Sequence, residues 1–113
     1  MDNKYILKNV SDIKAISTNH GIGLKKVFTN GEKCKSGLTQ AAFGFFKKGE
    51  KVEEHIHPTM EEFYFFESGK STFYIGEDIL SCKKGDFVMV PANVNHFIEA
   101  NTDIKFIYWG IRI

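Results

Sequence analysis

Clusters of turn-forming residues divide this chain into short apolar segments, and their spacing limits what it can fold into. The clusters lie at residues 68–70, 76–78, 83–86 and 101–103, as Ser-Gly-Lys, Gly-Glu-Asp, Lys-Lys-Gly-Asp and Asn-Thr-Asp. Glycine adopts positive φ angles freely, and Asn, Asp and Ser bond to nearby backbone groups, so each cluster can reverse the chain. Segments this short are typical of strands, and their regular punctuation predicts an all-β sandwich or barrel.

The segments between the turns are rich in β-branched and aromatic residues, which favour a pleated and half-buried backbone. The expected strands run Leu24 to Thr29, Leu38 to Lys48, Lys51 to His57, Glu62 to Glu67, Ser71 to Ile75, Ile79 to Cys82, Phe87 to Val90, His96 to Ala100 and Ile104 to Ile111. The second of these is apolar on both faces, as expected of a strand that is covered on each side. The helix content expected is one turn within 11–16, capped by Ser11 and Asp12.

A chain of 113 residues has room for one domain, which we take to span residues 1–113. Eleven Phe, four Tyr and one Trp suit a small barrel whose interior is filled by large side chains. The net charge is only +1, with lysines and acidic residues interspersed, so no basic face is available to attract nucleic acid or anionic lipid. We expect neither nucleic acid nor a membrane as a partner.

The N-terminal sequence MDNKYILKNVSDIKAIS contains no apolar region of signal-peptide length, and no apolar run approaches the ~20 residues of a membrane helix. These features predict a cytoplasmic protein. The tripeptide at 9–11, Asn-Val-Ser, fits a glycosylation sequon but is expected to be an ordinary solvated loop or strand end. Disulfides are rare in a reducing cytosol, so Cys34 and Cys82 are expected to be free thiols, although a bridge between them stays open.

Two histidines and a carboxylate lie in the run GEKVEEHIHPTMEEFYFFESG, which spans residues 49–69. Successive side chains of a strand point to opposite faces, so His55 and His57 share one face. Pro58 lacks an N–H and restricts the residue before it, which lets the chain turn there. The chain can then re-enter the sheet as a second strand that starts at Glu62.

A third histidine lies in a second run, GDFVMVPANVNHFIEAN, at residues 85–101. His96 begins a strand there, after Pro91 and a polar turn. Neutral imidazoles and a carboxylate suit divalent first-row transition metals. A sheet that curls into a barrel would bring groups from distant strands together. The sequence therefore predicts a metal site formed by His55, His57, Glu62 and His96.

The two runs resemble the paired motifs of the cupin family. The first matches G-x5-H-x-H-x4-E-x6-G without a gap, and the second follows G-x5-P-x-G-x2-H-x3-N with its glycine, proline and histidine in register. Two positions depart from the second motif, since Asn93 replaces a glycine and Asn101 comes one residue late. Asn tolerates a left-handed backbone, so the first change is mild. Neither position is an expected ligand, and the order of the two motifs makes the resemblance specific.

The resemblance implies a single-domain cupin-type barrel, a double-stranded β-helix or jelly roll, with its motifs at 49–69 and 85–101. It implies a divalent transition metal such as Fe, Mn, Ni or Zn, held by the three histidines and Glu62. It also implies a homodimer, which the apolar segments 41–46 and 106–109 favour independently. Two functions follow as expectations: a small-molecule metalloenzyme, dioxygenase-like or isomerase-like, or a cupin that binds or senses a small molecule without turnover.

Strand parity assigns a face to some residues near the motifs. Tyr64 and Phe66 share parity with Glu62 and are expected to point inward, which makes Glu62 and Tyr64 the candidates for proton transfer. Glu61 competes for the carboxylate position but is expected to face solvent or to close the turn. Parity leaves open whether the pocket is reached by Gln40, Glu53 and Trp109.

Arginine is scarce in this chain, with Arg112 the only one against fourteen lysines. A guanidinium clamps carboxylates and phosphates with two parallel hydrogen bonds, a geometry that lysine does not reproduce. Sugar phosphates and dicarboxylates are therefore weaker substrate candidates, although a lysine or histidine can still bind such an anion. His20 lies far from both motifs in the sequence and is expected to be a loop residue, with an approach to a partner subunit's pocket left open.

Overall fold

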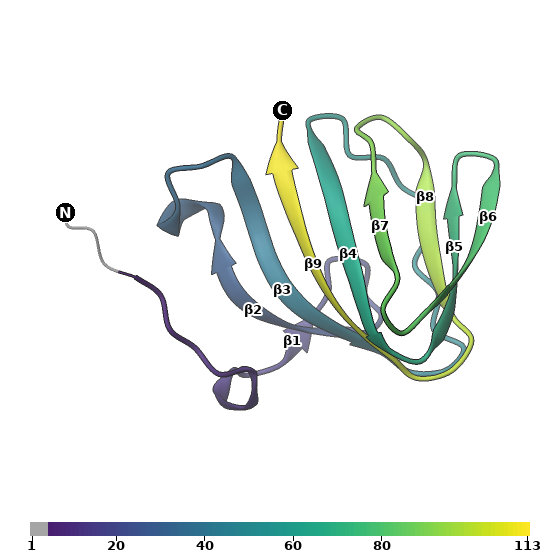
Figure 1. Ribbon diagram of the computed structural model, residues 1–113, viewed down its shortest axis with the longest axis horizontal. Helices are drawn as coiled ribbons and strands as arrows, with labels where there is room; N and C mark the ends of the chain where they lie inside the picture. The colour runs from purple at the N-terminus through teal and green to yellow at the C-terminus, as the bar shows by residue number, and fades with distance from the viewer. Residues whose placement is uncertain (1–4) are drawn as a thin grey trace.

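Two antiparallel β-sheets make up the computed structural model, which describes residues 5–113 (Figure 1). The six-stranded sheet has the spatial order β1 (Ile16–Ser17), β2 (Leu24–Asn30), β3 (Leu38–Phe46), β9 (Ile104–Arg112), β4 (Met60–Ser68) and β7 (Phe87–Val90). The three-stranded sheet has the order β6 (Asp78–Lys83), β5 (Lys70–Ile75) and β8 (His96–Ala100). The all-β jelly-roll barrel predicted from the sequence is confirmed.

Most of the expected strands appear within one or two residues of their predicted ends, and β7 and β8 match them. The expected strand from Lys51 to His57 is wrong, because this segment makes only isolated bridges, from Lys51 to Glu99 and from His55 to His96. Its backbone reaches β8 at intervals, with the His55 N–H donating to the His96 carbonyl at 3.1 Å. The two bridges differ in register by one residue, so the segment and β8 form no regular ladder.

The helical turn near the N-terminus is a short 3-10 helix, η1 (Val10–Asp12), and it begins earlier than predicted. Its cap is Asn9 and not Ser11 or Asp12, because the Asn9 carboxamide oxygen accepts a hydrogen bond from the Ser11 N–H at 2.9 Å. A second 3-10 helix, η2 (Gly31–Lys33), is capped in the same way by Asn30. Both asparagines therefore use their side chains to stabilise local turns.

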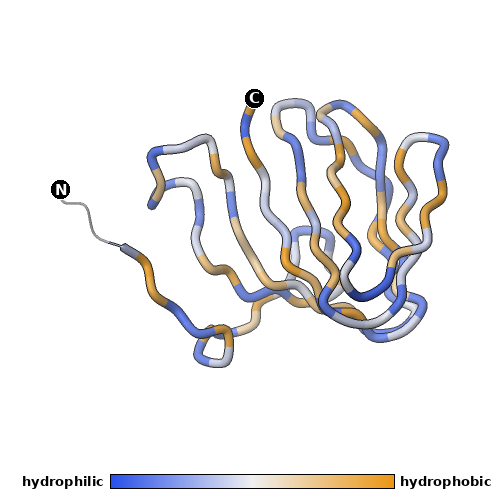
Figure 2. Tube along the Cα trace, viewed as in Figure 1, coloured by the Kyte–Doolittle hydropathy of each residue, from blue (hydrophilic) through white to orange (hydrophobic). Residues whose placement is uncertain are grey.

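Phenylalanine side chains from both sheets fill the space between them. Phe73 on β5 is fully buried, and its ring packs edge-on against Tyr64 at 5.0 Å and Phe66 at 6.4 Å between ring centroids. Phe106 on β9 packs edge-on against Phe46 at 5.2 Å. Figure 2 shows hydrophobic stretches along the strands and hydrophilic residues in most connecting turns. The inward rings thus form the predicted aromatic core.

The backbone conformation at two turns of the motifs explains why glycine stands at one and asparagine at the other. Gly69 has a φ of 86°, and a Cβ at this position would clash with the carbonyl oxygen of Asp103. Asn93, which departs from the motif glycine, has a φ of 67°. This left-handed conformation is one that asparagine tolerates, as predicted. Both turns therefore keep the backbone path that brings the two motifs together.

The outer face of the larger sheet carries four aromatic rings and a methionine, which we call the outer aromatic face: Phe63, Phe65, Phe87, Met89 and Trp109. Trp109 stacks on Phe63 at 5.6 Å between ring centroids and lies 6.3 Å from Phe87. Trp109 therefore points away from the barrel interior, which settles the face that parity left open. Within residues 5–113, no helix has the length and hydrophobicity needed to cross a membrane.

Candidate metal centre

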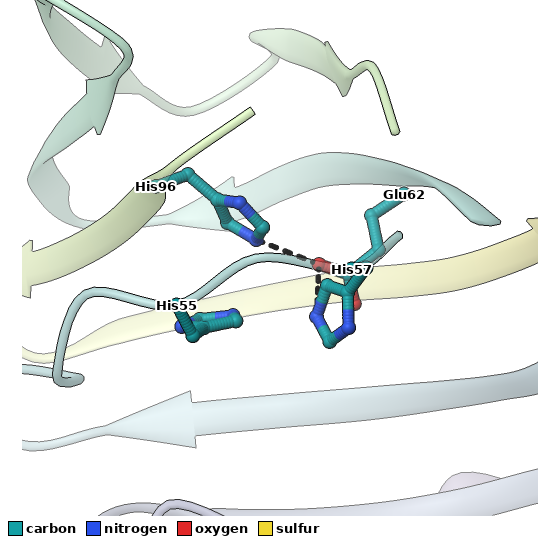
Figure 3. Close-up of side chains that lie close together, drawn as sticks. All are labelled: His55, His57, Glu62 and His96. Atoms are coloured by element: carbon teal, nitrogen blue, oxygen red, sulfur yellow. Dashed lines mark hydrogen bonds and ion pairs between the residues drawn. The ribbon is translucent and has the colours of Figure 1, made fainter. Parts of the chain in front are cut away.

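The four residues predicted to bind a metal lie close together (Figure 3). Glu62 comes from β4 of the larger sheet, His96 is the first residue of β8 of the smaller sheet, and His55 and His57 come from the segment between β3 and β4. One nitrogen or oxygen atom from each residue lies within 4.8 Å of the others. Both sheets thus contribute to a single cluster.

The Glu62 carboxylate lies at the centre of this cluster. Its Oε1 atom accepts a hydrogen bond from the Tyr64 hydroxyl at 2.9 Å and lies 3.1 Å from His96 Nε2 and 3.3 Å from His57 Nε2. Tyr64 and Glu62 are both buried, so the inward direction predicted for Tyr64 is confirmed. Glu53 stays exposed and meets the cluster only through its backbone, while Glu61 shares the outward parity of Phe63.

Backbone carbonyls orient two of the imidazole rings. His55 Nδ1 lies 2.8 Å from the Glu53 carbonyl oxygen, and His96 Nδ1 lies 2.9 Å from the Val94 carbonyl oxygen. A carbonyl can only accept, so each Nδ1 carries the proton. The Nε2 atom of His55 therefore keeps its lone pair, whereas Nε2 of His96 faces the Glu62 carboxylate and would release its hydrogen bond there to bind a cation. Metal-binding histidines usually show this arrangement, in which an outer partner fixes the tautomer and ring direction. The residues present therefore fit a divalent transition metal.

The protonation states of the cluster also suit a cation. Burial lowers the pKa of His55 to about 4, so its imidazole is neutral near pH 7. Burial by itself would raise the pKa of Glu62, but hydrogen bonds from His57, His96 and Tyr64 outweigh this effect and lower it, which keeps the carboxylate ionised. The hydrogen bond to Glu62 raises the pKa of His57, so a cation must displace a proton there.

A cavity of about 300 Å³ opens beside the four residues. Its walls include the aromatic rings of Phe46, Phe97, Phe106 and Tyr108. Gln40 on β3 also lines it, which answers the question that parity left open. A cavity of this size is at the small end of the range for ligand pockets. The site can therefore take a small molecule next to the four potential ligands.

Two cavity residues were not expected from the sequence. His20 was predicted to be a loop residue far from the motifs; it does lie in a turn, but its ring packs on His55 at 4.3 Å between centroids and lines the cavity of its own chain. Lys25 on β2 is buried and lines the same cavity. The signal for Lys25 was available in part, because it shares strand parity with Val27. Its position in the same cavity as the metal cluster depends on strand order, which the sequence does not reveal.

Curated relatives offer one partial match. Over 52 residues, the chain is 38% identical to an acireductone dioxygenase from a Hydrogenobaculum species. That match covers 42% of this chain and 28% of the relative, so the chain corresponds to well under half of that protein.

Solved structures match over nearly the whole chain. A predicted oxalate decarboxylase from Thermotoga maritima has a TM-score of 0.86 and 22% identity, with 96% of this chain and 100% of that chain covered. An RmlC-like cupin from Shewanella frigidimarina has a TM-score of 0.81 and 17% identity, with 100% and 96% covered. At these identities the two matches establish the fold alone.

The family model described as a cupin domain matches residues 43–109, which is more than half of the chain. This stretch contains both predicted motifs and all four residues of the cluster. The sequence match, the barrel and the arrangement of the cluster agree, and the chain belongs to the cupin family.

Proposed function

We propose that the protein is a small-molecule metalloenzyme that holds a divalent transition metal, Fe, Mn, Ni or Zn, through His55, His57, Glu62 and His96. The observation that carries the proposal is the approach of four ligand atoms to within 4.8 Å of one another beside a small cavity. Such an ion polarises substrate oxygen atoms, and a redox-active one also supports oxygen chemistry. Imidazole nitrogens and a carboxylate oxygen match the ligand preferences of these metals.

A dioxygenase-like reaction is the version that we favour over an isomerase-like one. Its support is the 38% identity over 52 residues with an acireductone dioxygenase. Tyr64 acts in this proposal by positioning Glu62, because its hydroxyl donates to the carboxylate. Burial and the neighbouring Glu62 charge raise the Tyr64 pKa well above its usual value, so the hydroxyl keeps its proton. Glu62 is then the remaining candidate for proton transfer.

Metal content and turnover test this proposal together. We expect near-stoichiometric Fe, Mn, Ni or Zn in the purified protein by plasma mass spectrometry, or after incubation with each ion. The loaded protein is then mixed with a panel of enediols, hydroxy acids and keto acids, and oxygen uptake and substrate loss are followed. Failure to take up any of these ions would overturn the proposal.

A cupin that binds or senses a small molecule without turnover is the second candidate. The observation that favours it is the aromatic part of the cavity lining, which is formed by Phe46, Phe97, Phe106 and Tyr108. A loaded protein that binds members of the panel tightly but leaves them unchanged would select this function over the first.

We further propose that two copies of the chain associate through the outer aromatic face. Phe87, Met89 and Phe65 are 58%, 41% and 40% exposed, and such a contiguous aromatic area is typical of an interaction surface. Light scattering after size exclusion is expected to give twice the 12.9 kDa of one chain. Phe87→Lys should give a monomer, whereas Ile79→Lys, on the smaller sheet, should leave the dimer intact. A monomeric wild type at micromolar concentration would contradict the proposal.

A cytoplasmic location completes the proposal. Its support is the state of the two cysteines, since Cys34 and Cys82 are both free thiols, as is usual in a reducing compartment. Fractionation of cells that express the natural protein tests this placement, and recovery outside the cytoplasm would contradict it.

A further inference from the structure

The side chain of Lys25 points into the cavity and is almost completely shielded from solvent. Only 6% of the residue is exposed, and it lies on β2 with its backbone paired to Gly44 of β3. The Nζ atom donates a hydrogen bond to Gln40 Oε1 at 3.1 Å. An ammonium group has three N–H donors, so this bond leaves two of them for another acceptor.

Lys25 has no carboxylate partner in the part of the chain that the structure describes, where the ion pairs involve His57, His96 and Lys83. Burial lowers the pKa of Lys25, and no neighbouring acid offsets this effect. A buried charge is costly unless it is paired and hydrogen-bonded. The Lys25 ammonium therefore lacks the negative partner that buried cations usually have.

The register of the larger sheet places Gln40 two strands away from Glu62 of the metal cluster. Gln40 pairs with Gly110 on β9, and Gly110 pairs with Glu62 on β4. Gln40 and Glu62 thus stand at one level of the sheet, separated by two strand spacings, or roughly 10 Å. All of these residues line the same cavity as Lys25. A small molecule could therefore contact the cluster at one end and the lysine at the other.

Charge balance indicates what kind of molecule this would be. A divalent ion with the Glu62 carboxylate leaves one positive charge, and Lys25 adds a second. Two negative charges are needed to neutralise them. The Gln40 amide can help, because its oxygen accepts from Lys25 and its NH₂ group keeps two donors for a ligand. The cavity of about 300 Å³ has room for roughly ten waters and hence only for a small dianion.

We propose that Lys25 and Gln40 form an anion subsite that binds one carboxylate of a small dicarboxylate while the other carboxylate meets the metal. The second half of this statement rests on the proposed metal site. The scarcity of arginine made dicarboxylates weaker substrate candidates. In this proposal a buried lysine supplies the cation that an arginine would otherwise provide. Lysine acts as a point charge on a flexible stem, so the carboxylate need not approach in one fixed orientation.

Calorimetric titration with malonate and succinate tests the subsite, with malonamide and succinamide as neutral controls. The metal-loaded wild type should bind at least one dicarboxylate and neither diamide. Lys25→Met should weaken that binding by about 10–100-fold, since hydrogen bonds to charged groups are strong. The matched control is Lys105→Met, which removes a charge from an exposed position on β9 and should leave binding unchanged.

A second variant keeps the test decisive if Lys25→Met folds poorly. Gln40→Glu has nearly the same shape and supplies Lys25 with an internal carboxylate partner. We expect it to keep the wild-type melting temperature and metal content and to lose dicarboxylate binding. The subsite would be overturned if metal-loaded wild-type protein bound neither malonate nor succinate. It would also be overturned if the Lys25→Met and Gln40→Glu variants bound them as Lys105→Met does. Either result would leave the proposed metal function standing.

The metal-free protein separates failure of the subsite from failure of the metal site. If the wild type takes up no metal, the proposed function is lost, and titration of the metal-free protein judges the subsite alone. Dicarboxylate binding that disappears in Lys25→Met supports the subsite in that case. No binding to the metal-free wild type would then overturn it.

Discussion

His96→Ala is expected to reduce metal affinity by more than about 100-fold and to leave almost no metal in the purified protein. His96 is 2% exposed and is the ligand candidate from the smaller sheet. Losing an outer partner of a metal ligand already costs about 10–100-fold in affinity, and losing the ligand itself should cost more. Competition against a chelating dye, together with plasma mass spectrometry, measures the loss.

A neighbouring histidine provides the control for this experiment. His20 packs on His55 but lies outside the group of four, so His20→Ala should retain metal close to the wild-type level. His57→Ala should lose it, as His96→Ala does. Circular dichroism confirms that each variant is folded. Metal at the wild-type level in folded His96→Ala would show that the cluster is not the binding site.

Phe73→Ala is expected to lower the free energy of unfolding by about 3–5 kcal/mol, the usual cost of emptying a buried aromatic site. Phe73 is 0% exposed and contacts rings on β4 from its place on β5, so it joins the two sheets. Domains of this kind are stable by only about 5–15 kcal/mol, so the change removes a large share of the total. Urea denaturation of the metal-free protein measures it.

The same titration on Ile79→Ala supplies the comparison. Ile79 lies on β6 and is 69% exposed, so its truncation should change the free energy of unfolding by less than about 0.5 kcal/mol. A loss under about 1 kcal/mol in Phe73→Ala would mean that the two sheets hold together by other contacts. The aromatic core described above would then not be their main connection.

The strands were predictable because turn residues and alternation are short-range patterns, and the cluster of four was predictable because its residues stand in two motifs that resemble those of the cupin family. Turn residues mark strand ends, and alternation sets the faces, which is why Tyr64 and Phe66 point inward as expected. The segment from Lys51 to His57 shows where such patterns fail. Its composition is that of a strand, but pairing is a tertiary property, and β8 meets it only at isolated bridges.

The part of the cavity around Lys25 and Gln40 could not be predicted because it depends on strand order. Lys25 and Gln40 come together only because β2 pairs with β3. Likewise, the face of Trp109 follows from its pairing with Phe63, which a lone strand does not indicate. The position of His20 requires the turn before β2 to fold back over His55. Long-range pairing therefore decides the ligand side of this site.

The division of the cavity between two stretches of chain has an evolutionary consequence. The cage of four potential metal ligands lies within residues 43–109, the stretch that matches the cupin domain, whereas His20, Lys25 and Gln40 precede that stretch. Substitutions in the earlier stretch can redirect ligand choice without disturbing the cage. Descendants of one ancestral barrel can thus keep the same ion and diverge in what they bind. An activity that is inferred from a relative through this shared stretch therefore concerns the four potential metal ligands and does not identify the substrate.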